Sequence, residues 1–241
     1  MIEDERDVPD QVPWSVPDAV TGIILLLPVS IFVGVAMGLF GMLVSFLAGV
    51  RPPEYLVIVA FGGATFFAGT GLAWWLGIHR RGGSIRDLGL TDVRPWLDPV
   101  LAGMGEIIVW VGLATYGLVL LKLAGQKVPE QPIVQMFGRS SLGFVLAVVF
   151  VAILGPIGEE VFFRGFVYTA FRGRWGVRVA MIASSAIFAL FHVVPLLYVP
   201  MFMMGLIFSA LFEHRGSLAP NIMMHSLNNF VALLVLYSRV K

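Results

Sequence analysis

Apolar residues fall into seven long runs that are separated by shorter polar segments. A helix needs about 20 consecutive apolar residues to cross the hydrocarbon core of a bilayer. Because backbone polar groups find no water there, each spanning run must be helical. The pattern predicts an all-α, polytopic transmembrane helical bundle of about seven spans, with eight as the alternative. The predicted spans are residues 20–47, 56–78, 100–123, 142–171, 177–194, 196–212 and 218–237.

The three longest polar segments lie at the N-terminus and on either side of the third span. Residues 1–18 open with acidic side chains, whereas a signal peptide opens with positive charge, so they predict an exposed polar tail. Residues 82–98 and 124–141 carry scattered charges and prolines and predict interfacial loops. The chain then divides into the tail, an N-terminal set of membrane helices with their loops (19–141) and a C-terminal helical core (142–241).

Composition places the chain in a membrane and excludes several kinds of chemistry. Of the 241 residues, 58% are hydrophobic and 13% charged, and the mean hydropathy is +0.89. Soluble domains carry about 25% charged residues. A net charge of +1 gives no electrostatic reason to expect a nucleic-acid partner. The absence of cysteine rules out disulfides, thiolate metal ligands and a cysteine nucleophile.

The distribution of Lys and Arg predicts the orientation. With seven spans, nine basic residues fall on the side of the N-terminus and six on the opposite side. Segments 80–94 and 172–178 supply seven of the nine. Since cytoplasmic loops carry the excess of positive charge, we expect a multi-pass membrane protein, in the cell membrane if prokaryotic, with a cytoplasmic N-terminus.

The first polar cluster inside the predicted spans contains Glu159, Glu160 and Arg164. Charged residues are costly in a bilayer and usually face the bundle interior or a water-filled cavity. Glu160 and Arg164 are four residues apart and can pair on one helix face. Glu159 points about 100° away and stays available as a base. The structural alternative is a Glu–Arg pair that only locks helices together.

Two further spans carry histidine. Phe188 and His192 lie near the end of one, and His225 shares a face of the last span with Asn229. An imidazole beside an amide can stabilise a carbonyl oxygen that becomes negative, and Asn228 competes with Asn229 for that role. The structural alternative for these residues is hydrogen bonding between helices.

Taken together, three helices supply a carboxylate, an imidazole, and an imidazole with an amide. These groups suffice to add water to a peptide bond, because one takes the proton, one orients the water and two stabilise the oxyanion. Glu106, the one mid-span charge of the first three spans, is interpreted as a structural hydrogen-bonding residue that contacts a neighbouring helix.

These three motifs resemble those of the CPBP family, which includes type II CAAX prenyl proteases, Abi proteins and lysostaphin-resistance-like proteins. The resembling residues are Glu159-Glu160-x-x-x-Arg164, Phe188-x-x-x-His192 and His225-x-x-x-Asn229. The resemblance implies a membrane-embedded catalytic cavity in which Glu159 and His192 activate water and His225 and Asn229 form the oxyanion site. Glu160, Arg164 and Phe188 would shape the site.

Metal dependence stays open at this stage. Glu159, His192 and His225 could form a zinc site with two histidines and a glutamate, and the family has been labelled metalloprotease. No H-E-x-x-H motif occurs, and we expect no cofactor. The chain also lacks a G-x-S-x-G motif and any aspartate within the predicted spans, which disfavours serine and aspartyl mechanisms.

The leading hypothesis is thus an intramembrane endopeptidase whose substrate is a membrane protein or a lipidated peptide. A proton- or ion-coupled transporter could use the same charged residues, but the sequence shows no inverted repeat. A non-catalytic immunity or scaffold protein is the third hypothesis, and it would keep its effect without Glu159.

Overall fold

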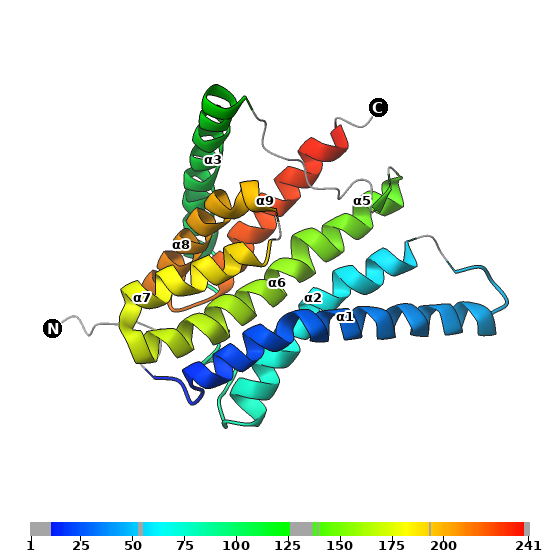
Figure 1. The fold of residues 1–241 in the computed structure, drawn as a ribbon, viewed down its shortest axis with the longest axis horizontal. Helices are drawn as coiled ribbons and strands as arrows, with labels where there is room; N and C mark the ends of the chain where they lie inside the picture. The colour runs from blue at the N-terminus through cyan, green and yellow to red at the C-terminus, as the bar shows by residue number, and fades with distance from the viewer. Residues whose placement is uncertain (1–10, 53–54, 126–136, 139, 193, 239–241) are drawn as a thin grey trace.

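The computed structural model describes residues 11–52, 55–125, 137–138, 140–192 and 194–238. In these ranges all regular structure is helical, and no strand occurs (Figure 1). In chain order the elements are α1 (Val16–Leu47), α2 (Leu56–Ala73), η1 (Trp74–His79), α3 (Leu97–Ala124), α5 (Ser141–Ala147), η2 (Val148–Leu154), α6 (Gly155–Glu160), η3 (Val161–Tyr168), α7 (Thr169–Leu190), η4 (Pro195–Leu197), α8 (Tyr198–Arg215) and α9 (Ala219–Ser238).

Five of the described helical stretches are long and apolar enough to cross a membrane: Val16–Leu47, Leu97–Leu123, Ser141–Leu190, Pro195–Arg215 and Ala219–Ser238. The all-α prediction is therefore confirmed. The third stretch contains two predicted spans, because the chain reverses near Gly176, whose φ of 78° is not helical (Figure 1). A total of seven or eight spans stays a prediction.

The segment from α5 to η3 runs through the middle of the bundle (Figure 1). All eight residues of η3 are buried, whereas many side chains of α1 are exposed and apolar, such as Phe32 and Phe46. An apolar helix exposed on this scale has lipid as its solvent. The α1 and α2 helices pack on one side of the central segment, and α7, α8 and α9 on the other, with α3 against α8 and α9.

Glycine allows α2 and α6 to approach closely. A Cβ atom at Gly158 would lie 2.7 Å from the Phe66 Cα, and one at Gly69 would lie 2.8 Å from the Gly158 carbonyl oxygen. Neither neighbour is a flexible side chain. Both positions therefore need glycine, and the backbone just before Glu159 is fixed against α2.

The end of the predicted tail is packed and not exposed. Residues 1–10 lie outside the described ranges, but Trp14 is buried and donates its indole N–H to the Phe166 carbonyl at 2.9 Å. Asp18 is buried in the first turn of α1 and pairs with Arg81 at 2.8 Å. The aromatic ring and the ion pair explain why this part of a polar segment folds onto the bundle.

Ion pairs also tie together the loops at this end of the bundle. Arg215 pairs with Asp98 at 2.6 Å, and Arg172 with Glu213 at 2.8 Å. The Leu218 N–H donates to the Gly89 carbonyl at 2.8 Å. The predicted loop at 82–98 thus lies against the connection between α8 and α9. Most of the other predicted loop, 124–141, lies outside the described residues.

Candidate active site

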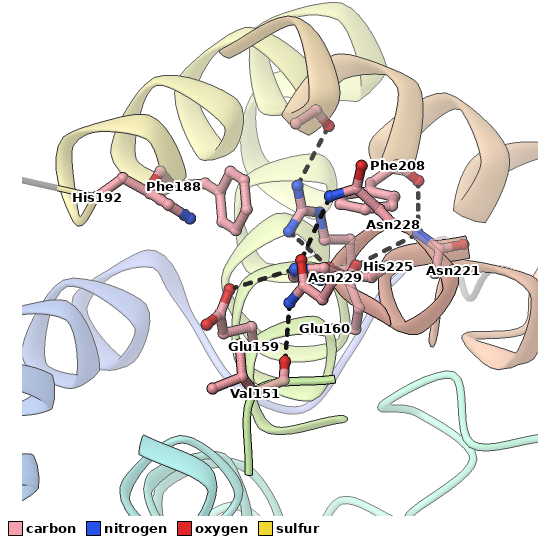
Figure 2. A network of polar contacts seen from close by, with 12 residues as sticks. Val151, Glu159, Glu160, Phe188, His192, Phe208, Asn221, His225, Asn228 and Asn229 are labelled. Carbon is pink, nitrogen blue, oxygen red and sulfur yellow. Dashed lines mark hydrogen bonds and ion pairs between the residues drawn. The ribbon is translucent and has the colours of Figure 1, made fainter. Parts of the chain in front are cut away.

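The polar residues singled out by sequence lie on α6, η3 and α9, and His192 lies just beyond the end of α7; they gather inside the bundle (Figure 2). Two π-helical segments, η2 and η3, flank the short α6 that carries Glu159 and Glu160. Such π-helical turns are often found at functional sites. The predicted motif residues therefore lie in one region of the bundle, although each makes different contacts there.

Glu160 and Arg164 form the buried pair that their spacing predicts. Their side chains are 0% and 1% exposed, and Arg164 Nη1 lies 3.1 Å from Glu160 Oε1. The guanidinium lies between the rings of Phe188 and Phe208, at 4.3 and 4.8 Å from their centroids. Cation–π contacts of this kind stabilise a desolvated cation. The structure thus gives Phe188 a definite role as one wall of the arginine site.

Asn221 also binds Glu160, and sequence reasoning missed it. This fully buried side chain donates to Glu160 Oε2 at 3.4 Å and to the Phe208 carbonyl at 2.7 Å. It lies four residues before His225, just as Asn229 lies four residues after it. This spacing of four residues places all three side chains on one face of α9, and it is the feature of the sequence from which Asn221 could have been predicted as a site residue.

His225 lies between the two glutamates. Its Nδ1 is 3.0 Å from Glu160 Oε1, and its Nε2 is 3.8 Å from Glu159 Oε2. Because an ionised carboxylate only accepts hydrogen bonds, we assign the proton of this contact to Nδ1. Glu160 thereby orients the imidazole so that Nε2 faces Glu159.

Glu159 is the carboxylate that remains available. Its side chain is 24% exposed, and its Oε2 is buried without a hydrogen-bond partner among the residues that the structure describes. At 3.8 Å His225 is within ion-pair distance but too far for a hydrogen bond. A buried acceptor left open in this way suits a water or substrate donor.

His192 and Asn229 are positioned by backbone carbonyls. His192 Nδ1 lies 2.9 Å from the Phe188 carbonyl, which must accept, so Nε2 is directed elsewhere. Asn229 Nδ2 donates to the Val151 carbonyl at 2.8 Å. Asn228, the rival amide, donates to Asn229 Oδ1 at 3.3 Å and supports it.

The structure does not join every pair that the sequence suggested. No hydrogen bond or ion pair connects His192 with Glu159 among the described residues, although both lie on the same side of the network in Figure 2. Nor do Glu159, His192 and His225 gather as a metal site, since no group of three His, Cys, Asp or Glu in the described ranges does so.

Glu106 is buried in α3, as a structural residue would be. The sequence predicted a hydrogen bond between Glu106 and a neighbouring helix, and this partner was wrong. One carboxylate oxygen of Glu106 accepts a hydrogen bond from Trp110 of the same helix.

Comparison with known proteins identifies the part of the chain that holds this site. Residues 141–231 match the family model described as type II CAAX prenyl endopeptidase Rce1-like. No curated protein and no solved structure matches the chain. The match begins with α5 and includes all three motifs, so the resemblance read from them is confirmed. The match of residues 141–231 thus supports a CPBP family intramembrane protease of the Rce1-like type.

Proposed function

We propose that the protein is an intramembrane endopeptidase that cleaves a peptide bond of a membrane protein or a lipidated peptide. The observation that carries the proposal is the Glu159 carboxylate. It has an open, buried oxygen beside His225, while the adjacent Glu160 is neutralised by Arg164. One carboxylate is thus free for chemistry and the other is used to build the site.

In the proposed reaction, Glu159 takes a proton from a water that the Nε2 atom of His192 helps to orient. The water oxygen bonds to the carbonyl carbon, and the carbonyl oxygen becomes negative. When the C–N bond breaks, the proton held by Glu159 passes to the leaving amine. The sum is the addition of one water across one peptide bond.

His225 and Asn229 are proposed to stabilise the oxyanion. Asn229 has a second amide hydrogen besides the one donated to Val151. His225 Nε2 is not hydrogen-bonded to Glu159, and because Nδ1 already donates to Glu160, Nε2 would act as a donor in the doubly protonated, charged form of the ring. Donors fixed before the reaction begins stabilise such a charge most effectively. The contacts of both side chains with backbone or carboxylate would hold them in place.

The test uses purified protein in detergent with a farnesylated CAAX peptide and a library of membrane-associated peptides. We expect wild-type protein to cleave at least one peptide and Glu159→Gln to lower kcat by about 10²–10⁴-fold. Thr115→Val is the control, because that exposed hydroxyl only binds a carbonyl of its own helix. Equal cleavage by wild type and Glu159→Gln would refute the assigned mechanism.

Metal dependence is decided in the same assay. We expect cleavage to survive a chelator, since Glu159 and the histidines can act on water directly. Loss of cleavage with a chelator and recovery with added zinc would contradict this expectation. Transport of protons or ions by wild-type vesicles without any peptide cleavage would favour the transporter hypothesis instead.

A further inference from the structure

A cavity lies where the start of α1 meets the first residues of α7. Its volume is about 420 Å³, which is within the usual range for the binding site of a small molecule. Residues 11–12 and 14–17 line one side, and Ala170 and residues 173–175 line the other. None of the motif residues lines it, so the cavity is separate from the candidate active site.

Contacts beside the cavity hold its two sides together. The buried Trp14 donates its indole N–H to the Phe166 carbonyl at 2.9 Å, and the same nitrogen lies 3.2 Å from the Thr169 hydroxyl. On the other side, the Trp175 ring packs against Phe171 with their centroids 4.8 Å apart. The cavity is therefore formed before a ligand arrives, which lowers the cost of ordering a binding site.

The ends of two spans place the cavity at the level of the bilayer surface. The α1 helix, which is long enough to cross a membrane, begins at Val16, and the chain reverses at Gly176 between two predicted spans. Tryptophan is enriched at this level, and Trp175 is 46% exposed. Beyond the cavity both helices expose aliphatic side chains, such as Val20 on α1 and Val179 on α7. A ligand here would meet water at one end and hydrocarbon at the other.

Arg174 supplies the charge of the cavity. It is exposed and lines the cavity, and within the described ranges it forms no ion pair. Asp18, the acidic residue in the first turn of α1, pairs with Arg81 at 2.8 Å and accepts two hydrogen bonds from Ser15. That carboxylate is therefore directed to other partners. The planar guanidinium of arginine has N–H donors whose geometry matches phosphate oxygens.

We propose that the cavity binds the headgroup of an anionic phospholipid, with the Arg174 guanidinium on the phosphate and the acyl chains along the exposed faces of α1 and α7. Basic pockets between membrane helices bind anionic headgroups in this way. A soluble phosphate would need only the arginine, whereas Trp14, Trp175 and Val16 add apolar walls that suit the glycerol and upper acyl region of a lipid. The proposal goes beyond the endopeptidase function and does not depend on it.

Residues 1–10, which precede the cavity along the chain, are a rival source of negative charge. They contain five acidic residues and one arginine. A carboxylate can pair with Arg174 as a phosphate does. Comparison of the full chain with a chain that lacks residues 2–10 therefore separates the two occupants.

Native mass spectrometry of the full chain, released from detergent micelles, measures bound lipid directly. From an equal mixture of phosphatidylglycerol and phosphatidylcholine, we expect the wild type to retain phosphatidylglycerol preferentially. Arg174→Gln should lower the affinity for phosphatidylglycerol about fivefold, the usual effect of one basic residue at a charged membrane surface, and Arg174→Lys should keep most of it. Arg178→Gln is the matched control, because Arg178 is also exposed but does not line the cavity.

Thermal unfolding shows whether the lipid binds the folded protein. Phosphatidylglycerol should raise the unfolding temperature of the wild type and of Arg178→Gln more than that of Arg174→Gln. Equal retention of the two lipids by the wild type, or equal losses in the two glutamine variants, would overturn the proposal. Phosphatidylglycerol binding that appears only after removal of residues 2–10 would assign the cavity to that segment. Binding of inorganic phosphate without a preference for phosphatidylglycerol would assign it to a soluble anion, and either result would overturn the proposal.

Discussion

At the scale of single residues, the site is built from two glutamates that are adjacent in sequence and different in environment. Glu160 is fully buried and contacts Arg164, His225 and Asn221, whereas Glu159 is partly exposed and keeps an open oxygen. Helical geometry turns neighbouring side chains by about 100°. One turn of α6 can therefore present a structural carboxylate and a second one that is open to a water or substrate donor.

Arg164→Ala should show that the Glu160–Arg164 ion pair is needed for folding. It would leave the Glu160 carboxylate buried without its cation, at a cost of about 3–5 kcal/mol. We expect a large drop in the thermal unfolding temperature in detergent. The double variant Glu160→Gln/Arg164→Met should recover much of that stability and remain inactive. A double variant that cleaves normally would show that the pair has no part in the site.

Asn221→Ala should disturb the Glu160 carboxylate at Oε2, the oxygen that Arg164 does not contact. The change removes the donor to Glu160 and to the Phe208 carbonyl, and a buried acceptor left without a partner costs about 1–3 kcal/mol. We expect a lower unfolding temperature and a reduced kcat. Asn228→Ala, whose amide only supports Asn229, is the comparison and should cost less. Equal effects would contradict a special role for Asn221.

Much of the site could be predicted at this scale because its residues repeat at the helical spacing of four. Glu160–Arg164, Phe188–His192 and His225–Asn229 all follow it. The partners between helices could not be predicted, since no spacing relates His225 to Glu160 or Asn229 to the Val151 carbonyl. Those contacts depend on how α9 rotates against α6 and η2.

At the scale of elements, glycines set the path of the chain around the site. Gly176 allows the chain to reverse between two predicted spans, which the hydrophobic pattern located but could not explain. Gly69 and Gly158 allow α2 to meet α6. The hydrophobic pattern wrongly predicted that the end of the polar tail is exposed. Trp14 is buried because it contacts η3, and Asp18 pairs with Arg81, and neither contact can be predicted from the pattern.

Gly176→Ala should destabilise the protein through backbone strain alone. The residue has φ of 78°, and a Cβ atom there would meet nothing within 4 Å. With ψ of 168°, this backbone conformation is essentially accessible to glycine alone, and it costs another residue about 1–3 kcal/mol. Gly71→Ala is the matched control, because Gly71 also has open space but lies in the helical region of α2. It should be neutral or slightly stabilising, and equal unfolding temperatures for the two variants would refute this explanation.

At the scale of the whole molecule, the ion pairs near the loops gather at one end of the bundle, where Asp18, Asp98 and Glu213 pair with Arg81, Arg215 and Arg172. The other end carries the end of α1, the start of α2 and the C-terminal end of α9 (Figure 1). These loops thus share one end of the bundle, as seven spans predict, and a cytoplasmic position for that end stays a prediction.

Cysteine labelling tests that orientation directly, because the chain contains no cysteine. Arg51→Cys and Arg86→Cys place one exposed thiol on each side of α2. In intact cells a membrane-impermeant maleimide should label residue 51, whereas residue 86 should be labelled only after permeabilisation. The reverse result would invert the orientation, and labelling of both from outside would show that α2 does not cross the membrane.

The local pairing of Glu160 with Arg164 has a consequence for how the protein enters the bilayer. The two side chains lie on successive turns of one helical stretch, so they can meet before any other helix is present. A single charge at mid-membrane costs about 2.5–3.5 kcal/mol on the insertion scale. Entering as a neutral pair avoids much of the cost of two separate charges. Arg172–Glu213 and Arg215–Asp98 join different helices and can form only after those helices have been inserted and assembled.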